Sequence, residues 1–383
     1  MRSLTRLAGA TVLAAATLAA ATAAFAGPAG AAVSHPRYHG LPGARHAVFV
    51  QTDNLAGNQV VAYRRAPDGT LTPAGTYATG GLGGQLSGSV VDHLASQGSL
   101  TYDPAQATLF AVNAGSNTVS VFGVHGDRLG LRQVIRSGGQ FPVSVAARGD
   151  LVYVLNAENG GSVQGYRVLG RFLVRIPGSH RALGLDPNAT PQFTTTPGQV
   201  AFTPDGSQLV VTTKGNGNDI DVFGVGFGGL LSTKPTVNEQ PGTVPFAISF
   251  DPFGHLVIAE AGPNALATFS LSRNGTVSLL SQAGTGQAAT CWVTLAGSFL
   301  FASNAGTPSE SGFTTSASGQ LSLLGNTATD PGAVDAASAA GGRFLYVQTR
   351  GNGIVDEFSL AANGALTKIG RSEEHTSELQ SRP

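Results

Sequence analysis

The sequence predicts an all-β protein, specifically a seven-bladed β-propeller of four-stranded blades. Two observations lead to this prediction. A strand-and-turn pattern recurs seven times along the 383 residues, and no segment after the first 26 residues has apolar side chains at helical spacing. Units of four short strands repeated at about 44 residues are typical of β-propellers, because each unit forms one blade.

Each copy of the pattern has the same parts in the same order. An apolar triplet that ends in a polar residue precedes a turn rich in Gly and Asn, and an alternating run then ends in an aromatic residue. These aromatics are Tyr63, Phe122, Tyr166, Phe223, Phe269, Phe313 and Phe358. Pairs such as Asp68-Gly69 follow them, as expected for tight hairpin turns that need positive φ. A further short strand precedes the triplet, as in "QVAFTPDGSQLVV", so each unit reads as strands a, b, c and d.

The N-terminus predicts export. A basic start, "MRSLTR", precedes an alanine-rich apolar run, and Ala24-Phe25-Ala26 fits a signal-peptidase site. We therefore expect residues 1–26 to be a signal peptide, with cleavage as late as residue 32 as an alternative, and residues 27–45 to be a flexible segment. The run is too weakly apolar to anchor firmly in a bilayer, so we expect a secreted protein without stable membrane insertion.

Residues 371–383, "RSEEHTSELQSRP", break the repeat. They are rich in charge, contain no glycine and resemble translated sequencing-adapter sequence, so we expect a non-native tail after a propeller of residues 46–370. In the other units a strand a begins at this distance after strand d, and the residues before Ala47 make a poor strand a. The inner edge of strand b in blade 1 is therefore expected to be unpaired.

Composition excludes several classes of function. The formal net charge is zero, from 22 basic and 22 acidic residues, and no basic patch indicates nucleic-acid binding. The only cysteine is Cys291, and no motif has the spacing of metal ligands, so we expect neither a metal nor a cofactor. We expect a monomer whose partner is a small molecule or another extracellular molecule.

Two insertions point to the functional face. The repeat is longer by roughly 13 to 18 residues at two places, which are residues 80–98 and 178–198. Both lie between strand d of one blade and strand a of the next, and in a propeller these connections share a face with the b–c loops. Insertions gathered on one face usually mark the binding face.

The insertions contain the candidate catalytic residues. His93 follows Asp92, and His180 precedes Arg181. A histidine beside a carboxylate could act as a general base, and an arginine could bind an anion or stabilise an oxyanion. The alternative is that these polar side chains bond to the backbone of their own surface loops.

Further candidates lie at strand ends on the same face. Lys214 and Glu260 could bind a ligand or simply pair with each other, and Arg350, Glu158 and Asp53 occupy comparable positions. Candidate ligand-binding residues are thus Asp92, Lys214, Glu260, Arg350, Gln287 and Trp292. Trp292 could form the floor of a pocket or fill the core between two blades. Cys291 has no basic neighbour in the sequence and is not expected to be a nucleophile.

The recurring "PDG…LVVT…GN…VF…NG" pattern resembles the bacterial lactonase-family propellers, which include 6-phosphogluconolactonase and carboxymuconate-cyclase types. The resemblance covers residues 46–370 and implies a seven-bladed fold and hydrolysis or isomerisation of a lactone or sugar-like ligand. The P-H-x-H stretch of characterised members has no counterpart, so no catalytic histidine carries over. The alternative function is a non-catalytic extracellular propeller that binds a ligand or a protein.

Overall fold

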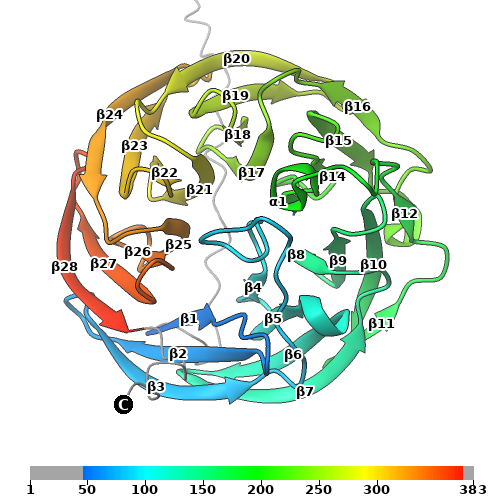
Figure 1. The fold of residues 1–383 in the computed structure, drawn as a ribbon, viewed down its shortest axis with the longest axis horizontal. Helices are drawn as coiled ribbons and strands as arrows, with labels where there is room; N and C mark the ends of the chain where they lie inside the picture. Colours follow the sequence, from blue (N-terminus) through cyan, green and yellow to red (C-terminus); the bar gives the residue numbers. More distant parts are fainter. Residues whose placement is uncertain (1–45, 374–383) are drawn as a thin grey trace, which may run out of the picture. The chain divides into compact units, whose positions relative to one another are not determined.

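The computed structural model describes residues 46–373, and these form seven antiparallel sheets arranged in a ring (Figure 1). Each sheet is one blade, and the chain passes through the blades in sequence order. Strands that follow each other in the main path of a blade are hydrogen-bonded neighbours in its sheet. The prediction of an all-β, seven-bladed propeller is therefore confirmed.

The strands have the following bounds. Blade 1 contains β1 (Ala47–Gln51), β2 (Gln59–Arg65) and β3 (Leu71–Ala78). Blade 2 contains β4 (Leu100–Asp103), β5 (Thr108–Asn113), β6 (Thr118–His125) and β7 (Arg128–Arg136). Blade 3 contains β8 (Pro142–Arg148), β9 (Leu151–Asn156), β10 (Ser162–Leu169), β11 (Phe172–Arg175) and the short β12 (Arg181–Ala182), which pairs with β10. Blade 4 contains β13 (Gln199–Phe202), β14 (Gln208–Thr212), β15 (Asp219–Gly224) and β16 (Thr236–Glu239).

The remaining three blades repeat this order. Blade 5 contains β17 (Pro245–Phe250), β18 (Leu256–Glu260), β19 (Ala265–Leu271) and β20 (Val277–Gly284). Blade 6 contains β21 (Thr290–Ala296), β22 (Phe299–Asn304), β23 (Ser309–Thr315) and β24 (Leu321–Ala328). Blade 7 contains β25 (Ala333–Ala339), β26 (Phe344–Thr349), β27 (Ile354–Leu360) and β28 (Leu366–Glu373). Three single helical turns complete the described chain, namely η1 (Ala114–Ser116), α1 (Gln192–Thr195) and η2 (Phe227–Gly229).

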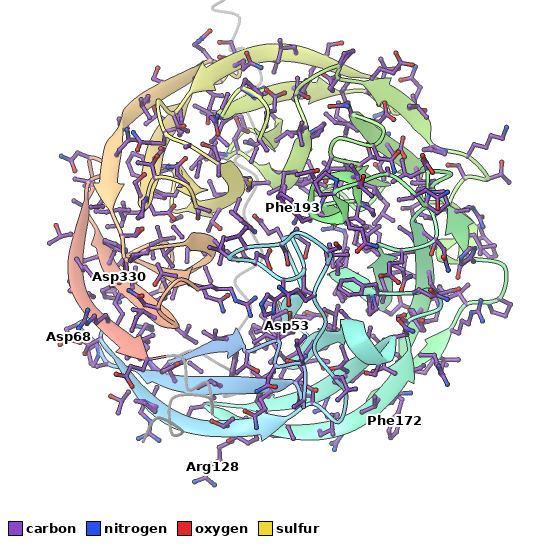
Figure 2. The ribbon with its side chains drawn as sticks, in the orientation of Figure 1. Asp53, Asp68, Arg128, Phe172, Phe193 and Asp330 are labelled. Atoms are coloured by element: carbon purple, nitrogen blue, oxygen red, sulfur yellow. The ribbon has the colours of Figure 1, made fainter. Side chains whose placement is uncertain are left out.

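The core lies between the blades, and the repeated aromatics form part of it. All seven closing aromatics are at most 1% exposed. Phe269 of blade 5 packs with Val210 of blade 4, and Tyr63 of blade 1 packs with Tyr346 of blade 7. The recurring aromatic is therefore a contact between neighbouring blades. Truncating such a buried side chain to alanine is expected to lower the free energy of unfolding by about 3–5 kcal/mol. Side chains such as Arg128 project from the rim instead (Figure 2).

The turn at Asp68-Gly69 helps to join the first blade to the last. Gly69 has φ +98°, and a Cβ at this position would lie 2.3 Å from the Phe344 ring of blade 7. The Tyr346 hydroxyl donates to the Gly69 carbonyl oxygen at 2.7 Å, and the Leu71 amide donates to Glu357 Oε2 at 3.1 Å. Glycine is required here both by the backbone conformation and by the close approach of blade 7.

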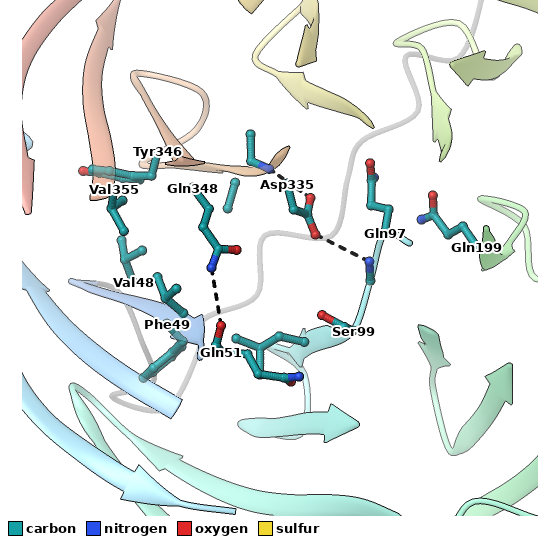
Figure 3. Close-up of a pocket in the computed structure, with 15 residues that line it drawn as sticks. Val48, Phe49, Gln51, Gln97, Ser99, Gln199, Asp335, Tyr346, Gln348 and Val355 are labelled. Atoms are coloured by element: carbon teal, nitrogen blue, oxygen red, sulfur yellow. Dashed lines mark hydrogen bonds between the residues drawn. The ribbon is translucent and has the colours of Figure 1, made fainter. Parts of the chain in front are cut away.

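Blade 1 differs from the prediction of four strands in every blade. Within residues 46–373 its sheet has only β1, β2 and β3, so the inner edge of β1 has no strand beside it. A cavity of about 250 Å³ lies against this edge, between Val48 and Val50 of blade 1 and Tyr346 and Val355 of blade 7 (Figure 3). Because the expectation of an unpaired inner edge also depends on residues outside the described range, it stays a prediction.

β28 runs three residues beyond residue 370, where the sequence analysis placed the end of the propeller. Arg371, Ser372 and Glu373 belong to β28, because the antiparallel register with β27 continues to the pair Ile354 and Glu373. The Ser372 hydroxyl donates to Glu357 Oε1 at 2.7 Å, and the Tyr63 hydroxyl donates to the Glu373 carbonyl oxygen at 2.7 Å. The rest of the predicted tail, the predicted signal peptide and the segment 27–45 lie outside the described residues.

Supplying an inner strand to blade 1 is expected to raise the melting temperature. The change replaces residues 374–383 by a flexible linker and a strand of alternating apolar and polar residues. The new strand would pair with the inner edge of β1 and cover its apolar side chains. For a domain of this size, each kcal/mol gained raises the melting temperature by roughly 1–2 °C. Thermal unfolding followed by circular dichroism measures the effect. A Gly/Ser extension of equal length is the control, and equal melting temperatures for the two would contradict the prediction.

Candidate active site

The two predicted insertions meet on one face of the ring, with α1 in the second of them (Figure 1). The Ser87 amide donates to Gln192 Oε1 at 2.9 Å, and the Phe193 amide donates to the Ser87 carbonyl oxygen at 3.4 Å. Phe193 and Asp53 lie close to the centre of this view (Figure 2). The two insertions therefore contact each other on one face, and the assignment of this face to function stays a prediction.

The first insertion is also bonded to blades on different sides of the ring. The Ser96 hydroxyl donates to the Val143 carbonyl oxygen of blade 3 at 2.8 Å, and Trp292 Nε1 of blade 6 donates to the Ser96 carbonyl oxygen at 2.9 Å. The Gln97 side chain exchanges two hydrogen bonds, at 2.9 and 3.0 Å, with the backbone of Val293. These bonds hold residues 92–97 as a fixed part of the face.

Lys214 joins both insertions to blade 4. Its side chain is completely buried, and its ammonium group donates to the carbonyl oxygens of Ala95 and Phe193 at 2.7 and 2.8 Å and to Thr196 Oγ1 at 3.2 Å. Burial lowers the pKa of Lys214 to about 7. No ion pair within residues 46–373 joins Lys214 to Glu260, so the predicted alternative of a mutual pair is wrong. We interpret Lys214 as a structural residue whose hydrogen bonds hold the two insertions together.

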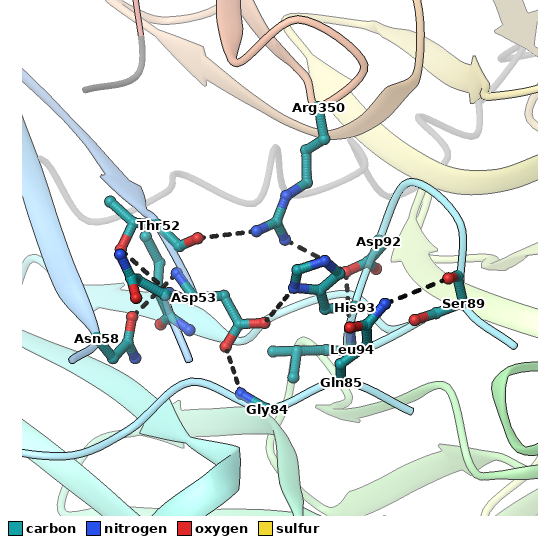
Figure 4. A network of polar contacts seen from close by, with 12 residues as sticks. Thr52, Asp53, Asn58, Gly84, Gln85, Ser89, Asp92, His93, Leu94 and Arg350 are labelled. Carbon is teal, nitrogen blue, oxygen red and sulfur yellow. Dashed lines mark hydrogen bonds and ion pairs between the residues drawn. The ribbon is translucent and has the colours of Figure 1, made fainter. Parts of the chain in front are cut away.

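Asp53 and His93 form the central pair of the face (Figure 4). His93 Nδ1 lies 3.7 Å from Asp53 Oδ2, and the two side chains are 32% and 1% exposed. Asp53 follows β1 in the b–c loop of blade 1. Its backbone amide donates to Asn58 Oδ1 at 3.0 Å, and its Oδ1 accepts from the Gly84 amide at 3.2 Å. A buried carboxylate thus faces a histidine that reaches solvent.

The first insertion comes close to Asp53 because it begins with glycines. A Cβ on Gly83 would lie 2.1 Å from the Asp53 carbonyl oxygen. Any larger residue would push the insertion away from the b–c loop of blade 1. The glycines of residues 80–84 therefore allow the loop that carries His93 to pack directly on the loop that carries Asp53.

Arg350 supplies the positive charge of the site. It follows β26 in blade 7, and its Nη2 donates to the Thr52 carbonyl oxygen at 2.9 Å (Figure 4). Its Nη1 lies 3.6 Å from Asp92 Oδ1. Asp92 in turn accepts hydrogen bonds from the amides of Leu94 and Ser96, at 3.1 and 2.9 Å. Asp92 therefore positions its own loop and the arginine. This agrees with the alternative given in the sequence analysis, in which the polar side chains of the insertions bond to the backbone of their own loops.

These groups open into a cavity of about 360 Å³ that Asp53, His93 and Arg350 line together. A carboxylate that faces an imidazole can orient the ring and stabilise its protonated form, which allows the ring to act as a general base. A guanidinium group beside it can stabilise a developing oxyanion. At 3.7 Å, His93 Nδ1 and Asp53 Oδ2 are within ion-pair distance but not within hydrogen-bond distance. Contacts of this kind often tighten only when substrate binds. The arrangement is therefore suited to the attack of water on a carbonyl carbon.

His180 lies in a different place from His93. It lines a separate cavity of about 520 Å³ together with Arg136 and Glu158 of blades 2 and 3. The neighbouring Arg181 is held by the backbone: its guanidinium group donates to the carbonyl oxygens of Ser232, Leu231, Gly178 and His180, at 2.6 to 2.8 Å. The structure does not bring these two residues together with His93, and Arg181 links blade 3 to blade 4.

Glu260 and Gln287 have local partners. Gln282 Nε2 donates to Glu260 Oε2 at 2.5 Å within blade 5, and burial raises the pKa of Glu260 to about 7. Gln287 Oε1 accepts from the Ser309 hydroxyl at 3.3 Å, and its Nε2 donates to the Gly286 carbonyl oxygen. Neither residue lines the cavity of His93. Both remain predictions as ligand-binding residues.

Trp292 fills a gap between two blades, as one of its two predicted alternatives stated. It is 4% exposed, and its ring meets that of Phe246 of blade 5 edge-on at 5.1 Å. Burial raises the pKa of the neighbouring Cys291 thiol to about 12, which opposes a role as nucleophile. Trp292 and Cys291 also line a second cavity on this face, next to that of His93.

The pairing of Asp53 with His93 was missed by the sequence analysis. Asp53 was considered only as one of several charged residues at b-strand ends. The two residues are forty positions apart, and only the packing of the first insertion on blade 1 brings them together. The strand order could have indicated this proximity, because a connection from strand d to the next strand a and a b–c loop lie on the same face of a propeller.

Comparisons with known proteins agree with the fold. A sequence model of the family described as "Lactonase, 7-bladed beta-propeller" matches residues 86–372. No curated protein sequence matches the chain. Among solved structures, the periplasmic gluconolactonase of Pseudomonas aeruginosa is 20% identical with a TM-score of 0.69, over 86% of this chain and 96% of that one.

Two further solved structures are similar at lower identity. A proposed 6-phosphogluconolactonase from Bacteroides uniformis is 17% identical with a TM-score of 0.66, over 81% of this chain and 90% of that one. Virginiamycin B lyase from Staphylococcus aureus is 15% identical with a TM-score of 0.52, over 73% of this chain and 86% of that one. At these identities the likeness shows a common fold, and it leaves the chemistry to the residues of the site.

Proposed function

The chain belongs to the lactonase family of seven-bladed β-propellers, and from this premise we propose that it hydrolyses a lactone at the cavity of Asp53, His93 and Arg350. The single observation that carries the proposal is the position of the Asp53–His93 pair beside Arg350 in a cavity on the insertion face. The names of similar solved structures, two of which are gluconolactonase types, support the same class of reaction.

In the proposed reaction His93 acts as the general base. The imidazole takes a proton from water while the water oxygen attacks the lactone carbonyl carbon, and Asp53 stabilises the imidazolium that forms. Arg350 stabilises the negative charge on the carbonyl oxygen of the tetrahedral intermediate. The intermediate then collapses, the ring C–O bond breaks, and His93 returns its proton to the leaving alkoxide. The product is the open-chain hydroxy acid.

The proposal is tested by hydrolysis of a lactone panel with the purified protein. We expect acid release, measured by pH-stat, from at least one of gluconolactone, 6-phosphogluconolactone and simple γ-lactones. The variant His93→Gln is expected to lose about 100- to 10,000-fold in kcat/KM, because an amide cannot take the proton. Absence of turnover with the whole panel would leave a non-catalytic binding propeller as the function.

The chain offers a matched control for this variant. His255 and Asp251 form another histidine–aspartate pair, with Nδ1 2.8 Å from Oδ2, in the a–b turn between β17 and β18. This turn lies at the ends of the strands opposite to the b–c loops. His255→Gln is therefore expected to leave lactone hydrolysis unchanged. Equal losses in His255→Gln and His93→Gln would indicate a general effect on the fold and contradict the assignment.

A further inference from the structure

A second cavity on the insertion face has an almost entirely apolar lining. It measures about 250 Å³, and its largest walls are Phe193 of the second insertion, Phe246 of blade 5 and Trp292 of blade 6. Ala305 and Cys291 contribute smaller parts of the wall. The indole ring is held in place because Trp292 Nε1 donates to the Ser96 carbonyl oxygen, and the backbone of Phe193 is held because its carbonyl oxygen accepts from Lys214 Nζ.

This apolar pocket adjoins the proposed catalytic cavity. Val90 and Val91 of the first insertion line both cavities, so a wall of two valines separates them. His93 comes two residues after this wall. A molecule with its reacting carbonyl at His93 can therefore extend an attached group over the valines and into the apolar pocket.

The lining determines what kind of group fits. Asp92 is its one charged residue, and both carboxylate oxygens of Asp92 already accept hydrogen bonds from Leu94 and Ser96. Such a pocket gains free energy from apolar surface and offers little to a hydroxyl or phosphate group. Its volume accommodates about eight carbon-sized groups at roughly 30 Å³ each. An aliphatic chain of medium length has this size and chemistry.

The catalytic cavity does not favour a phosphorylated substrate. Arg350 is the only lysine or arginine that lines it, and its guanidinium group already bonds to the Thr52 carbonyl oxygen and lies 3.6 Å from Asp92. A phosphate dianion is usually bound by several donors or cations at once. The charge of a sugar phosphate would therefore be only partly compensated here.

From these contacts we propose that the substrate is a lactone that carries an aliphatic chain, with the chain held between Phe193, Phe246 and Trp292. This inference rests on the proposed function, because it places the reacting ring at His93. It goes further in naming the substrate class and the residues that select it. The two insertions determine selectivity, since one carries Phe193 and the other carries the valine wall.

Trp292 provides a direct measurement of the pocket that does not require turnover. It is the only tryptophan of the chain, so tryptophan fluorescence, excited selectively over that of the seven tyrosines, reports on this site. The His93→Gln variant is titrated with γ-butyrolactone, γ-hexalactone, γ-octalactone and γ-decalactone. We expect the fluorescence to change on binding and the Kd to fall by about fourfold for each methylene until the pocket is full.

Steady-state kinetics of lactone hydrolysis by the wild-type protein complete the test. We expect kcat/KM of the wild-type protein to rise along the same series and to exceed the value for 6-phosphogluconolactone. Ala305→Leu would fill the pocket and remove the gain in kcat/KM of γ-decalactone over γ-butyrolactone. Ala362→Leu, at an exposed alanine in the turn before β28, is the matched control and should retain the gain.

The outcomes separate the inference from the function on which it rests. Hydrolysis of lactones with no dependence on chain length, or equal behaviour of Ala305→Leu and Ala362→Leu, would overturn the inference and leave the proposed function standing. A chain-length dependence of Trp292 fluorescence without hydrolysis of any lactone would overturn the proposed function, and with it the assignment of the ligand as a substrate.

Discussion

Replacing Asp53 by asparagine is expected to lower kcat for lactone hydrolysis by about 100- to 10,000-fold, with little change in KM. The asparagine amide cannot stabilise the imidazolium of His93, and it can hold the ring in the wrong tautomer. Asp53 is 1% exposed, so little of its side chain is open to the cavity that it lines with His93, and it acts on the reaction through His93 as a positioning residue. A loss confined to kcat follows from this position.

The variant should fold normally for two reasons. Asparagine can still accept the hydrogen bond that the Gly84 amide gives to Asp53 Oδ1 at 3.2 Å. Asp53 has φ +54°, a left-handed conformation that asparagine adopts readily. Thermal unfolding should therefore change little.

Asp251→Asn, in the pair with His255, is the matched control and is expected to keep full activity. The measurement is the full dependence of rate on substrate concentration for both variants. An unchanged kcat in Asp53→Asn, or a loss that appears only as a higher KM, would exclude the Asp53–His93 pair from the chemical step.

Replacing Glu310 by glutamine is expected to stabilise the protein at pH 8 and to flatten its stability between pH 5 and pH 8. Glu310 of β23 is completely buried, and burial raises its pKa to about 8, with Asp335 and Asp356 adding to the increase and Ser303 opposing it. The folded state therefore keeps the carboxyl group protonated in a range where the unfolded chain ionises it. The free energy of unfolding falls as pH rises through this range, by on the order of 1 kcal/mol per pH unit.

Other buried groups affect the same profile. Burial also raises the pKa values of Asp221, Glu260 and Asp335 to about 7, so they destabilise the fold in the same direction as pH rises from 5 to 7. Lys214 acts oppositely above pH 7, because a lowered lysine pKa makes stability rise with pH until the unfolded lysine titrates. The difference between wild type and Glu310→Gln isolates the contribution of Glu310.

Chemical denaturation at several pH values measures this difference. Glu239→Gln, at an exposed glutamate of β16, is the control. The Glu239 carboxylate helps burial to raise the pKa of Asp219, so this variant is expected to change the profile, but much less than Glu310→Gln does. A profile of Glu310→Gln that runs parallel to that of the wild type would show that Glu310 is ionised in the folded protein and contradict the prediction.

The repeat made the fold predictable from the sequence. Each strand c ends in an aromatic residue that must be buried against the preceding blade, and each tight turn shows as a pair such as Asp68-Gly69. These signals are local and recur at a regular period, so seven copies reinforce one another. The two insertions were predictable for the same reason, because they interrupt a known period.

The roles of single polar residues were much less predictable. Arg181 and Lys214 were both candidate site residues from the sequence, yet backbone carbonyl oxygens and a threonine hydroxyl accept hydrogen bonds from them in the structure. His180 and His93 both belong to insertions, yet they line separate cavities. Such roles depend on which group of another blade lies within about 3 Å, and no local pattern encodes this.

The sequence by itself determined the architecture of this protein, because strand alternation, turn residues and buried aromatics act over short distances and repeat. It also indicated the functional face, because loop position in a propeller follows from strand order. Only the tertiary structure decided which residues meet there. Asp53, His93 and Arg350 come from blade 1, the first insertion and blade 7, and their convergence requires the ring to bring its first and last blades together.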